Sequence, residues 1–225
     1  IEEKKLNREQ VGFMALFNRK YIKITFLAIL IALFNQLSGI NAIIYFAPRI
    51  FDMAGISAES ALLSTVGIGV TNIIATMLGL FLIDRIGRKK LMYIGSFGYI
   101  ISLVLIAYSF SGAQINNTFL PLFVFMFIAS HAVGQGAVIW VFISEIFPNE
   151  LRAHGQSMGC FTHWILAAVI ANVFPLMANQ FGPIVIFGFF AFMMVLQLIW
   201  VFTKMPETKG RSLEEIQQEF IRENG

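Results

Sequence analysis

The chain has 225 residues, of which 57% are hydrophobic and 13% charged, and its mean hydropathy is +0.75. A soluble domain of this length could not bury so much apolar surface, so the composition indicates a membrane protein. The net charge of +3 is explained by membrane topology, argued below, and predicts no nucleic-acid partner.

Residues 1–20 mix charged side chains with Val11, Phe13, Met14 and Phe17. This pattern favours a cytoplasmic linker containing an interfacial helix over a disordered leader.

Four charge-free runs follow, at 24–48, 60–83, 91–144 and 153–203. A helix needs about 20 apolar residues to cross the hydrocarbon core, so each of the last two runs is long enough for two spans. Turn signals lie near their midpoints, at 111–118 and 179–183. We therefore predict an all-α domain over residues 21–205. Its six spans are expected at roughly 22–46, 60–83, 90–110, 118–144, 155–178 and 183–203.

Lys and Arg side chains set the expected orientation. Of the 16 in the chain, all but Arg49 fall on one side when six spans alternate across the membrane. The sequence thus predicts a multi-pass protein of the plasma membrane, bacterial inner membrane included, with both termini cytoplasmic.

The first span contains the stretch "FNQLSGINAIIYF" at 34–46. It places Asn35, Gln36 and Asn41 around Gly39 in the middle of an apolar run. A helix that loosens near the midplane frees polar groups for a cavity, as in carrier binding sites. Amides can both donate to and accept from hydroxyl groups, so we expect Gln36 to face a water-filled cavity and to bind a polyol.

No Asp, Glu, Lys or Arg lies in the middle of any predicted span. A charge there costs at least about 3 kcal/mol on insertion scales, so a neutral solute is favoured. Trp140 and Trp164 offer flat faces for the C–H face of a sugar ring, and Gly134 and Gly136 would let the fourth span bend. Close helix packing by these glycines is the competing interpretation. The histidines 131 and 163 are interpreted as hydrogen-bonded spacers rather than proton carriers, and Gln197 and Asn172 as contacts between helices.

Charged residues gather where the second and fourth spans end on the predicted cytoplasmic side. They are Asp84, Arg85, Arg88, Glu145 and Arg152. We predict that Glu145 pairs with Arg85 or Arg88 and holds the helix ends together.

The last segment, 206–225, is predicted to be a cytoplasmic tail. Ser212 and Glu215 form a capping box, and Leu213, Ile216 and Phe220 share one face of the amphipathic helix that would follow.

Four motifs resemble those of the sugar porter family of the major facilitator superfamily. They are "NQLSGINAIIYFAP" at 35–48, "DRIGRKK" at 84–90, "SEIFPNELR" at 144–152 and "PETKG" at 206–210. They follow the family order over nearly the whole chain and match the second half of a twelve-helix carrier, like that of bacterial xylose and glucose symporters. The resemblance implies that an N-terminal six-helix half is the partner of this chain.

The resemblance also implies roles for individual residues. The sugar site would be formed by Asn35, Gln36, Asn41, Asn72, Gly136, Trp140, His163 and Trp164. Tyr45 and Phe46 would form an external gate, and the cytoplasmic charges would form a latch that closes when the carrier faces outward. The chain departs from the family at Asn35, where the first Gln of the motif is usual. It departs again at Gln135, Ala137 and Ile139, where prolines are often seen.

These features predict transport of a neutral monosaccharide by alternating access. The resemblance implies a proton-coupled symporter whose coupling carboxylate lies in the other half, and facilitated diffusion stays open beside symport. Two further alternatives remain open: a carrier of another neutral polyol such as inositol, and a six-span half that senses sugar or forms a homodimer. No carboxylate pair, metal cluster or nucleophile–base pair is placed in the membrane, so we predict neither an enzyme nor a cofactor or metal. Membrane lipid is the remaining expected partner.

Overall fold

The structure is a computed structural model that describes residues 12–112, 117–211 and 215–216. The described chain forms helices and no strand. A short 3₁₀ helix, η1 (Phe13–Phe17), precedes the long helices α1 (Ile22–Leu37), α2 (Ile40–Met53), α3 (Ala58–Ile86) and α4 (Arg88–Ser109). After η2 (Asn117–Phe119) come α5 (Leu120–His131), the π-helical turn η3 (Ala132–Gly136), α6 (Ala137–Ile146) and α7 (Arg152–Thr203).

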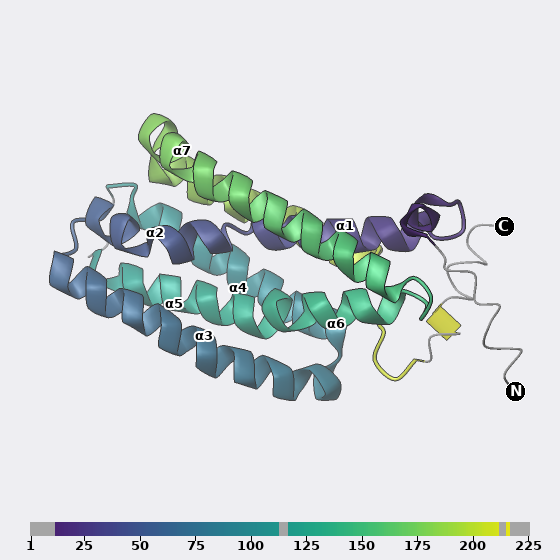
Figure 1. Ribbon diagram of the computed structural model, residues 1–225. Helices are drawn as coiled ribbons and strands as arrows, with labels where there is room; N and C mark the ends of the chain where they lie inside the picture. Colours follow the sequence, from purple (N-terminus) through teal and green to yellow (C-terminus); the bar gives the residue numbers. More distant parts are fainter. Residues whose placement is uncertain (1–11, 113–116, 212–214, 217–225) are drawn as a thin grey trace, which may run out of the picture.

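Within the described residues, five helical stretches are long and apolar enough to cross a membrane: 22–53, 58–86, 88–109, 120–146 and 152–203. The last has 52 residues, which would be about 78 Å if straight, more than twice the hydrocarbon thickness of about 30 Å. It is broken at Gly182, which has φ 75° and ψ 165° and precedes Pro183. Six spans therefore result, and α7 doubles back on itself at one end of the bundle (Figure 1).

The first span extends beyond residue 46, where the sequence analysis expected it to end. It consists of α1 and α2, separated at Gly39, whose φ of 82° lies in the left-handed region where only glycine is unstrained. Helix α2 then continues through Pro48 to Met53, with a non-helical residue at Phe46. Pro48 lacks an N–H and its ring clashes with the carbonyl four residues earlier, so it kinks this helix without ending it.

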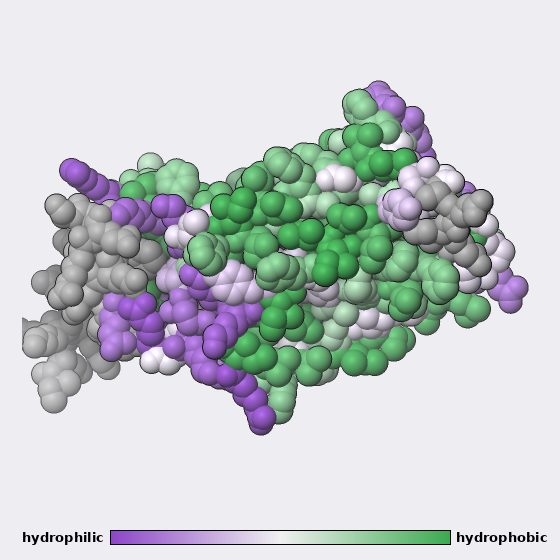
Figure 2. All heavy atoms as spheres, turned by 180° about the vertical axis from the view of Figure 1, so that it is seen from behind, coloured by the Kyte–Doolittle hydropathy of each residue, from purple (hydrophilic) through white to green (hydrophobic). Residues whose placement is uncertain are grey.

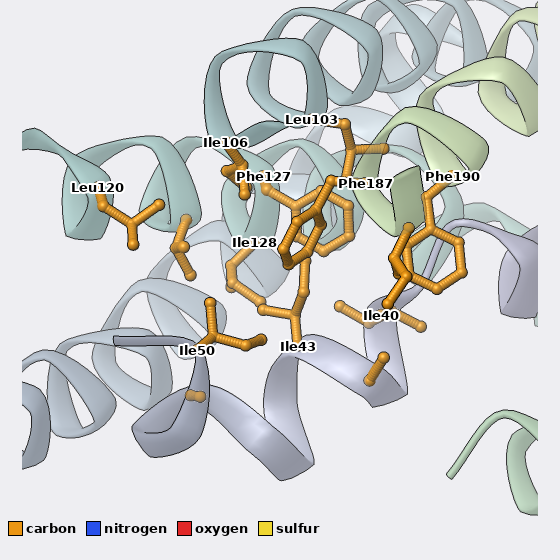
Figure 3. Packing of buried hydrophobic residues seen from close by; sticks show 14 of the residues in the cluster. Ile40, Ile43, Ile50, Leu103, Ile106, Leu120, Phe127, Ile128, Phe187 and Phe190 are labelled. Carbon is orange, nitrogen blue, oxygen red and sulfur yellow. The ribbon is translucent and has the colours of Figure 1, made fainter. Parts of the chain in front are cut away.

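Two clusters of buried apolar side chains hold the bundle together. One joins α2 to α4, α5 and the second leg of α7, with Ile43 facing Phe127 and Phe187 (Figure 3). The other lies toward the opposite end and joins α1, α6 and the end of α7, with Ile31, Phe142 and Val201 fully buried. The outer surface is also apolar: on the face that Figure 2 shows, hydrophobic residues cover the middle, and polar residues lie toward the two ends, most of them at one end. Such a surface is what the hydrocarbon core of a bilayer would cover.

Helices α4 and η3 cross at very close range. The Cα of Gly134 would lie 2.9 Å from a Cβ placed on Gly95, and the Cα of Gly95 would lie 2.8 Å from a Cβ placed on Gly134. Small residues at a crossing let two backbones approach in a membrane. The interpretation that the glycines allow close helix packing therefore holds for Gly134. The π-helical turn is a widened turn in the fourth span, of a kind often found at functional sites.

The two ends of the chain are described only in part. Of the segment expected to be an interfacial helix, residues 12–20 are described, and they contain only η1, which Thr25 anchors by donating a hydrogen bond to the carbonyl of Leu16 at 2.8 Å. Most of the predicted tail helix lies outside the described residues.

Candidate functional site

Three amide side chains meet where the first span breaks. Asn41 Nδ2 donates to Gln36 Oε1 at 2.8 Å, and Gln36 Nε2 donates to Asn35 Oδ1 at 3.1 Å. The geometry depends on the break, because Gly39 ends α1 and starts α2 while Ser38 donates to the carbonyl of Asn35 at 2.6 Å. We call Asn35, Gln36, Asn41 and His163 the amide cluster.

His163 brings α7 into this cluster. Its two ring nitrogens lie 3.1 and 3.2 Å from Gln36 Nε2, across 127 residues of sequence. The ring packs edge-on against Trp140 of α6, with centroids 5.1 Å apart, and against Trp164, with centroids 5.0 Å apart. Four predicted site residues from the first and fifth spans, together with Trp140, are thus brought to one place.

The members of the cluster differ in exposure. Asn35 and Gln36 are 1% and 0% exposed, whereas Asn41, His163 and Trp140 are half-buried. The expectation that Gln36 faces a water-filled cavity is wrong for this conformation, because its neighbours enclose it and satisfy its amide. Asn41 and His163 are the members of the cluster that a solute can reach first, together with the neighbouring Trp140.

The other residues assigned to the site are Asn72, Trp164 and Gly136, of which Trp164 contacts the cluster through the ring of His163. Asn72 is half-buried on α3, and among the described residues no hydrogen bond joins it to the cluster. Trp164 is 61% exposed. Gly136 closes the π-helical turn beside His131.

The two predicted gate residues point in different directions. Tyr45 is 53% exposed. Phe46 stacks on Phe174 of α7, with ring centroids 5.2 Å apart. Of the two, Phe46 is therefore held against the neighbouring span.

A second polar chain crosses the bundle and was not anticipated as a unit. Gln197 donates to Ser96 Oγ at 2.8 Å and accepts from Gln135, while Tyr99 lies 3.1 Å from Gln135 Oε1 and bonds to His131. It links α4, η3 and the second leg of α7. The interpretation of Gln197 as a contact between helices fits this arrangement, as does that of His131 as a hydrogen-bonded spacer.

At the polar end of the molecule, Arg88 and Glu145 form a bidentate ion pair. Arg88 Nη2 lies 2.6 Å from Glu145 Oε1, and Arg88 Nε lies 3.0 Å from Oε2. Asp84 contacts the same guanidinium at 3.1 Å. Among the described residues, Arg85 and Arg152 form no ion pair with Glu145; Arg85 lies over the ring of Phe81, and the Nε of Arg152 is buried without an acceptor.

Residues just after α7 add to this charge network, which sequence reasoning missed. Glu207 accepts hydrogen bonds from the backbone N–H groups of Arg88 and Lys89, at 3.0 and 3.1 Å, and so caps the start of α4. Thr208 donates to Glu145 Oε2 at 2.7 Å. The motif at 206–210 was noticed in the sequence, but nothing in its residue types indicated which helix it would contact.

Comparison with known proteins identifies the family. The model of the "Sugar (and other) transporter" family matches residues 2–220. The chain belongs to this family. It is 38% identical over 221 residues to the arabinose-proton symporter of Bacillus subtilis. This alignment covers 98% of the chain and 48% of the symporter. It is 36% identical over 209 residues to the glucose transporter GlcP of Staphylococcus epidermidis. This alignment covers 90% of the chain and 46% of GlcP.

A solved structure places the fold within the major facilitator superfamily. The proton:xylose symporter XylE, bound to 6-bromo-6-deoxy-D-glucose, superposes with a TM-score of 0.82 and 28% identity. The superposition covers 97% of this chain and 46% of XylE. The chain therefore has the fold of a membrane-spanning half of this superfamily, and it spans about half the length of the relatives it matches.

Proposed function

We propose that the protein to which this chain belongs moves a neutral monosaccharide across a membrane by alternating access, and that the chain is its C-terminal half. The amide cluster carries this proposal. Asn41 and His163 are half-buried and can exchange hydrogen bonds with hydroxyl groups, and the indole of Trp140 stands beside them as a flat apolar face.

The relatives support the substrate class. Arabinose, glucose and xylose appear in the names of the relatives given above, and all three are neutral monosaccharides. Proton coupling is proposed on the same basis, since two of those three names describe proton symporters. No Asp or Glu lies in the middle of a predicted span here, so the coupling carboxylate would be supplied by an N-terminal half.

In this proposal the sugar contacts the amide cluster, Trp140 and, from α3, Asn72. The cluster must open for Gln36 to take part, because the amide is enclosed in this conformation. Tyr45 and Phe46 would close the external side. Gly136, in the π-helical turn, would form part of the wall of the sugar site. Trp164 would support that wall through its edge-on contact with His163.

The proposed setting is a plasma membrane, in bacteria the inner one, with the charge network of Arg88 and Glu145 on the cytoplasmic side. The positive-inside rule supports this orientation, as does the shared end of the bundle at which α1 begins and α7 ends (Figure 1). Reporter fusions after residues 113 and 180 are expected to read external. A cytoplasmic signal at either position would contradict the orientation.

Uptake of labelled solutes by liposomes containing the complete two-half carrier tests the function. We expect accumulation of at least one pentose or hexose, driven by an inward proton gradient. Preference for inositol over every monosaccharide would instead favour the polyol carrier. Binding of sugar without uptake would favour a sensor, and uptake without a proton gradient would contradict coupling.

A further inference from the structure

An open groove runs between the first two turns of α1 and the end of α7, away from the amide cluster. It is lined by Ile22, Lys23, Phe26, Leu27, Leu30, Trp200 and Lys204. Its volume of about 430 Å³ falls in the range of small-molecule sites, about 300–1,000 Å³. We refer to these residues as the α1–α7 groove.

The groove is basic at one end and apolar along its length. Lys23 lies at the start of α1, and Lys204 directly follows α7, so two lysines 181 positions apart in the sequence line the same hollow. The remaining lining residues are aliphatic or aromatic. This division of charge matches an amphiphile with an anionic head and an apolar chain.

The dimensions fit the depth of a lipid. Lys23 and Leu30 are seven residues apart on one helix, which is about 10 Å along its axis. The lysines lie at the end of the predicted span, where a bilayer presents its head groups, and Leu30 lies about two helical turns deeper in the same span. A molecule lying in the groove would thus have its charge at the interface and its chain in the hydrocarbon core.

The wall of the groove also contains an aromatic side chain. Trp200 lines the groove and is 8% exposed, and its ring lies against Phe34 of α1. The flat apolar face of an indole is a surface against which an acyl chain can lie.

We propose that the α1–α7 groove binds one anionic phospholipid. The phosphate lies between Lys23 and Lys204, and an acyl chain lies along Phe26, Leu30 and Trp200. The lipid then joins the first and last spans of this chain. Because the two lysines select a negative head group, the groove differs from the apolar surface that any lipid chain can cover.

A second groove of the chain provides an internal comparison. It is lined by Tyr93, Phe97, Leu198, Ile199 and Phe202, between α4 and α7, and its lining includes no charged residue. An acyl chain can occupy this surface, but the lining offers no group to select a negative head. A preference for anionic lipid is therefore expected from the α1–α7 groove and not from this one.

The test is lipid binding to the full chain in detergent, followed by mass spectrometry under non-denaturing conditions. Phosphatidylglycerol and phosphatidylcholine with identical acyl chains are titrated separately. We expect one phosphatidylglycerol to bind with preference. Each lysine near an anionic lipid contributes enough for about a fivefold effect, so Lys23→Gln with Lys204→Gln should weaken phosphatidylglycerol binding by about 30-fold.

The matched control is Lys20→Gln with Lys90→Gln. These lysines are exposed near the same end and lie outside the groove lining, so this control removes the same charge and should leave binding unchanged. Leu30→Trp fills the groove, so it should weaken phosphatidylglycerol binding although both lysines are present. If the double lysine variant unfolds, the single variants Lys23→Gln and Lys204→Gln replace it, and each should weaken phosphatidylglycerol binding by about fivefold.

Three results would overturn the proposal. They are equal affinity for the two lipids, equal loss in the control pair, and full binding after both groove lysines are replaced. Soluble glycerol 3-phosphate is not expected to compete, because it lacks the chain. Competition at equal concentration would mean that the lysines bind a free anion and that no lipid site exists.

Discussion

Arg88 and Glu145 are 57 residues apart in sequence, and two hydrogen bonds of 2.6 and 3.0 Å join them. The pair connects the start of α4 to the end of α6, so it links the third span to the fourth at one membrane face. The Arg88 side chain is 9% exposed and that of Glu145 is 28% exposed. A bidentate pair at this burial is less screened by solvent than an exposed one.

We predict that Glu145→Gln shifts the complete carrier toward its inward-facing form. The neutral amide loses the charge that holds Arg88, so the latch weakens while the amide cluster stays intact. The expected shift is about fivefold in the population ratio, or about 1 kcal/mol. It would be measured by the labelling rate of a cysteine placed in the inner cleft.

The matched control for the latch is Asp84→Asn. Asp84 contacts the same guanidinium at 3.1 Å, but its side chain is 79% exposed, so its loss should hardly change the labelling rate. Labelling of Glu145→Gln no faster than that of the control would mean that the pair has no role in gating.

Glu207→Ala is predicted to destabilise the start of α4. Its carboxylate accepts from the N–H groups of Arg88 and Lys89, which have no intrahelical acceptor at a helix N-terminus. Loss of a cap costs about 0.5–2 kcal/mol, so the unfolding temperature in detergent should fall. Glu150→Ala is the control, because Glu150 is exposed in the loop before α7; equal falls in both variants would argue against the cap.

Asn41→Ala is predicted to weaken sugar binding by the complete carrier without unfolding it. Asn41 is half-buried, and a lost hydrogen bond to a bound hydroxyl costs about 1–3 kcal/mol, or about 5- to 150-fold in affinity. Tryptophan fluorescence or equilibrium dialysis would measure it. Asn172→Ala is the control. This amide was expected to join two helices, but it is exposed and bonds to its own helix at Ala168; an equal effect there would remove Asn41 from the site.

Gln36→Ala should lower both sugar affinity and thermal stability. The side chain is fully buried and bonded to Asn35, Asn41 and His163, so its removal leaves polar partners unsatisfied. Reduced stability with unchanged affinity would mean that Gln36 only joins the helices.

The spans were predictable from the sequence because charge-free runs report directly on what a bilayer accepts. The break at Gly39 was predictable for a similar reason, since a glycine among amides stands out in an apolar run. The continuation of α2 through Pro48 was not, because packing of Ile50 and Phe51 in the core offsets the cost of the kink. The polar chain was missed because its partners are 32 to 101 residues apart, and pairing at that separation depends on how the helices cross.

The chain alone is predicted not to transport sugar. Alternating access needs one half to rock against another around a site between them, and in the proposed carrier this chain would form only one wall of that site. Uptake by liposomes containing only the purified chain should equal that of empty liposomes, while co-reconstitution with an N-terminal half should restore it. Uptake above the empty control would support a homodimer instead.

The last prediction concerns the bond between Gln135 and Gln197, both 0% exposed. Gln135→Leu leaves Gln197 and Tyr99 each without one partner, and Gln197→Leu leaves Ser96 and Gln135 in the same position, so each should destabilise the chain by about 1–3 kcal/mol. The double variant removes both amides at once and should cost less than the sum, by about 0.6 kcal/mol or more. A double-mutant cycle on denaturant unfolding in detergent measures this coupling, with Thr203→Val as the control because this exposed hydroxyl bonds only to its own helix. Strictly additive effects would mean that the two amides act independently and that the polar chain does not hold η3 against α7.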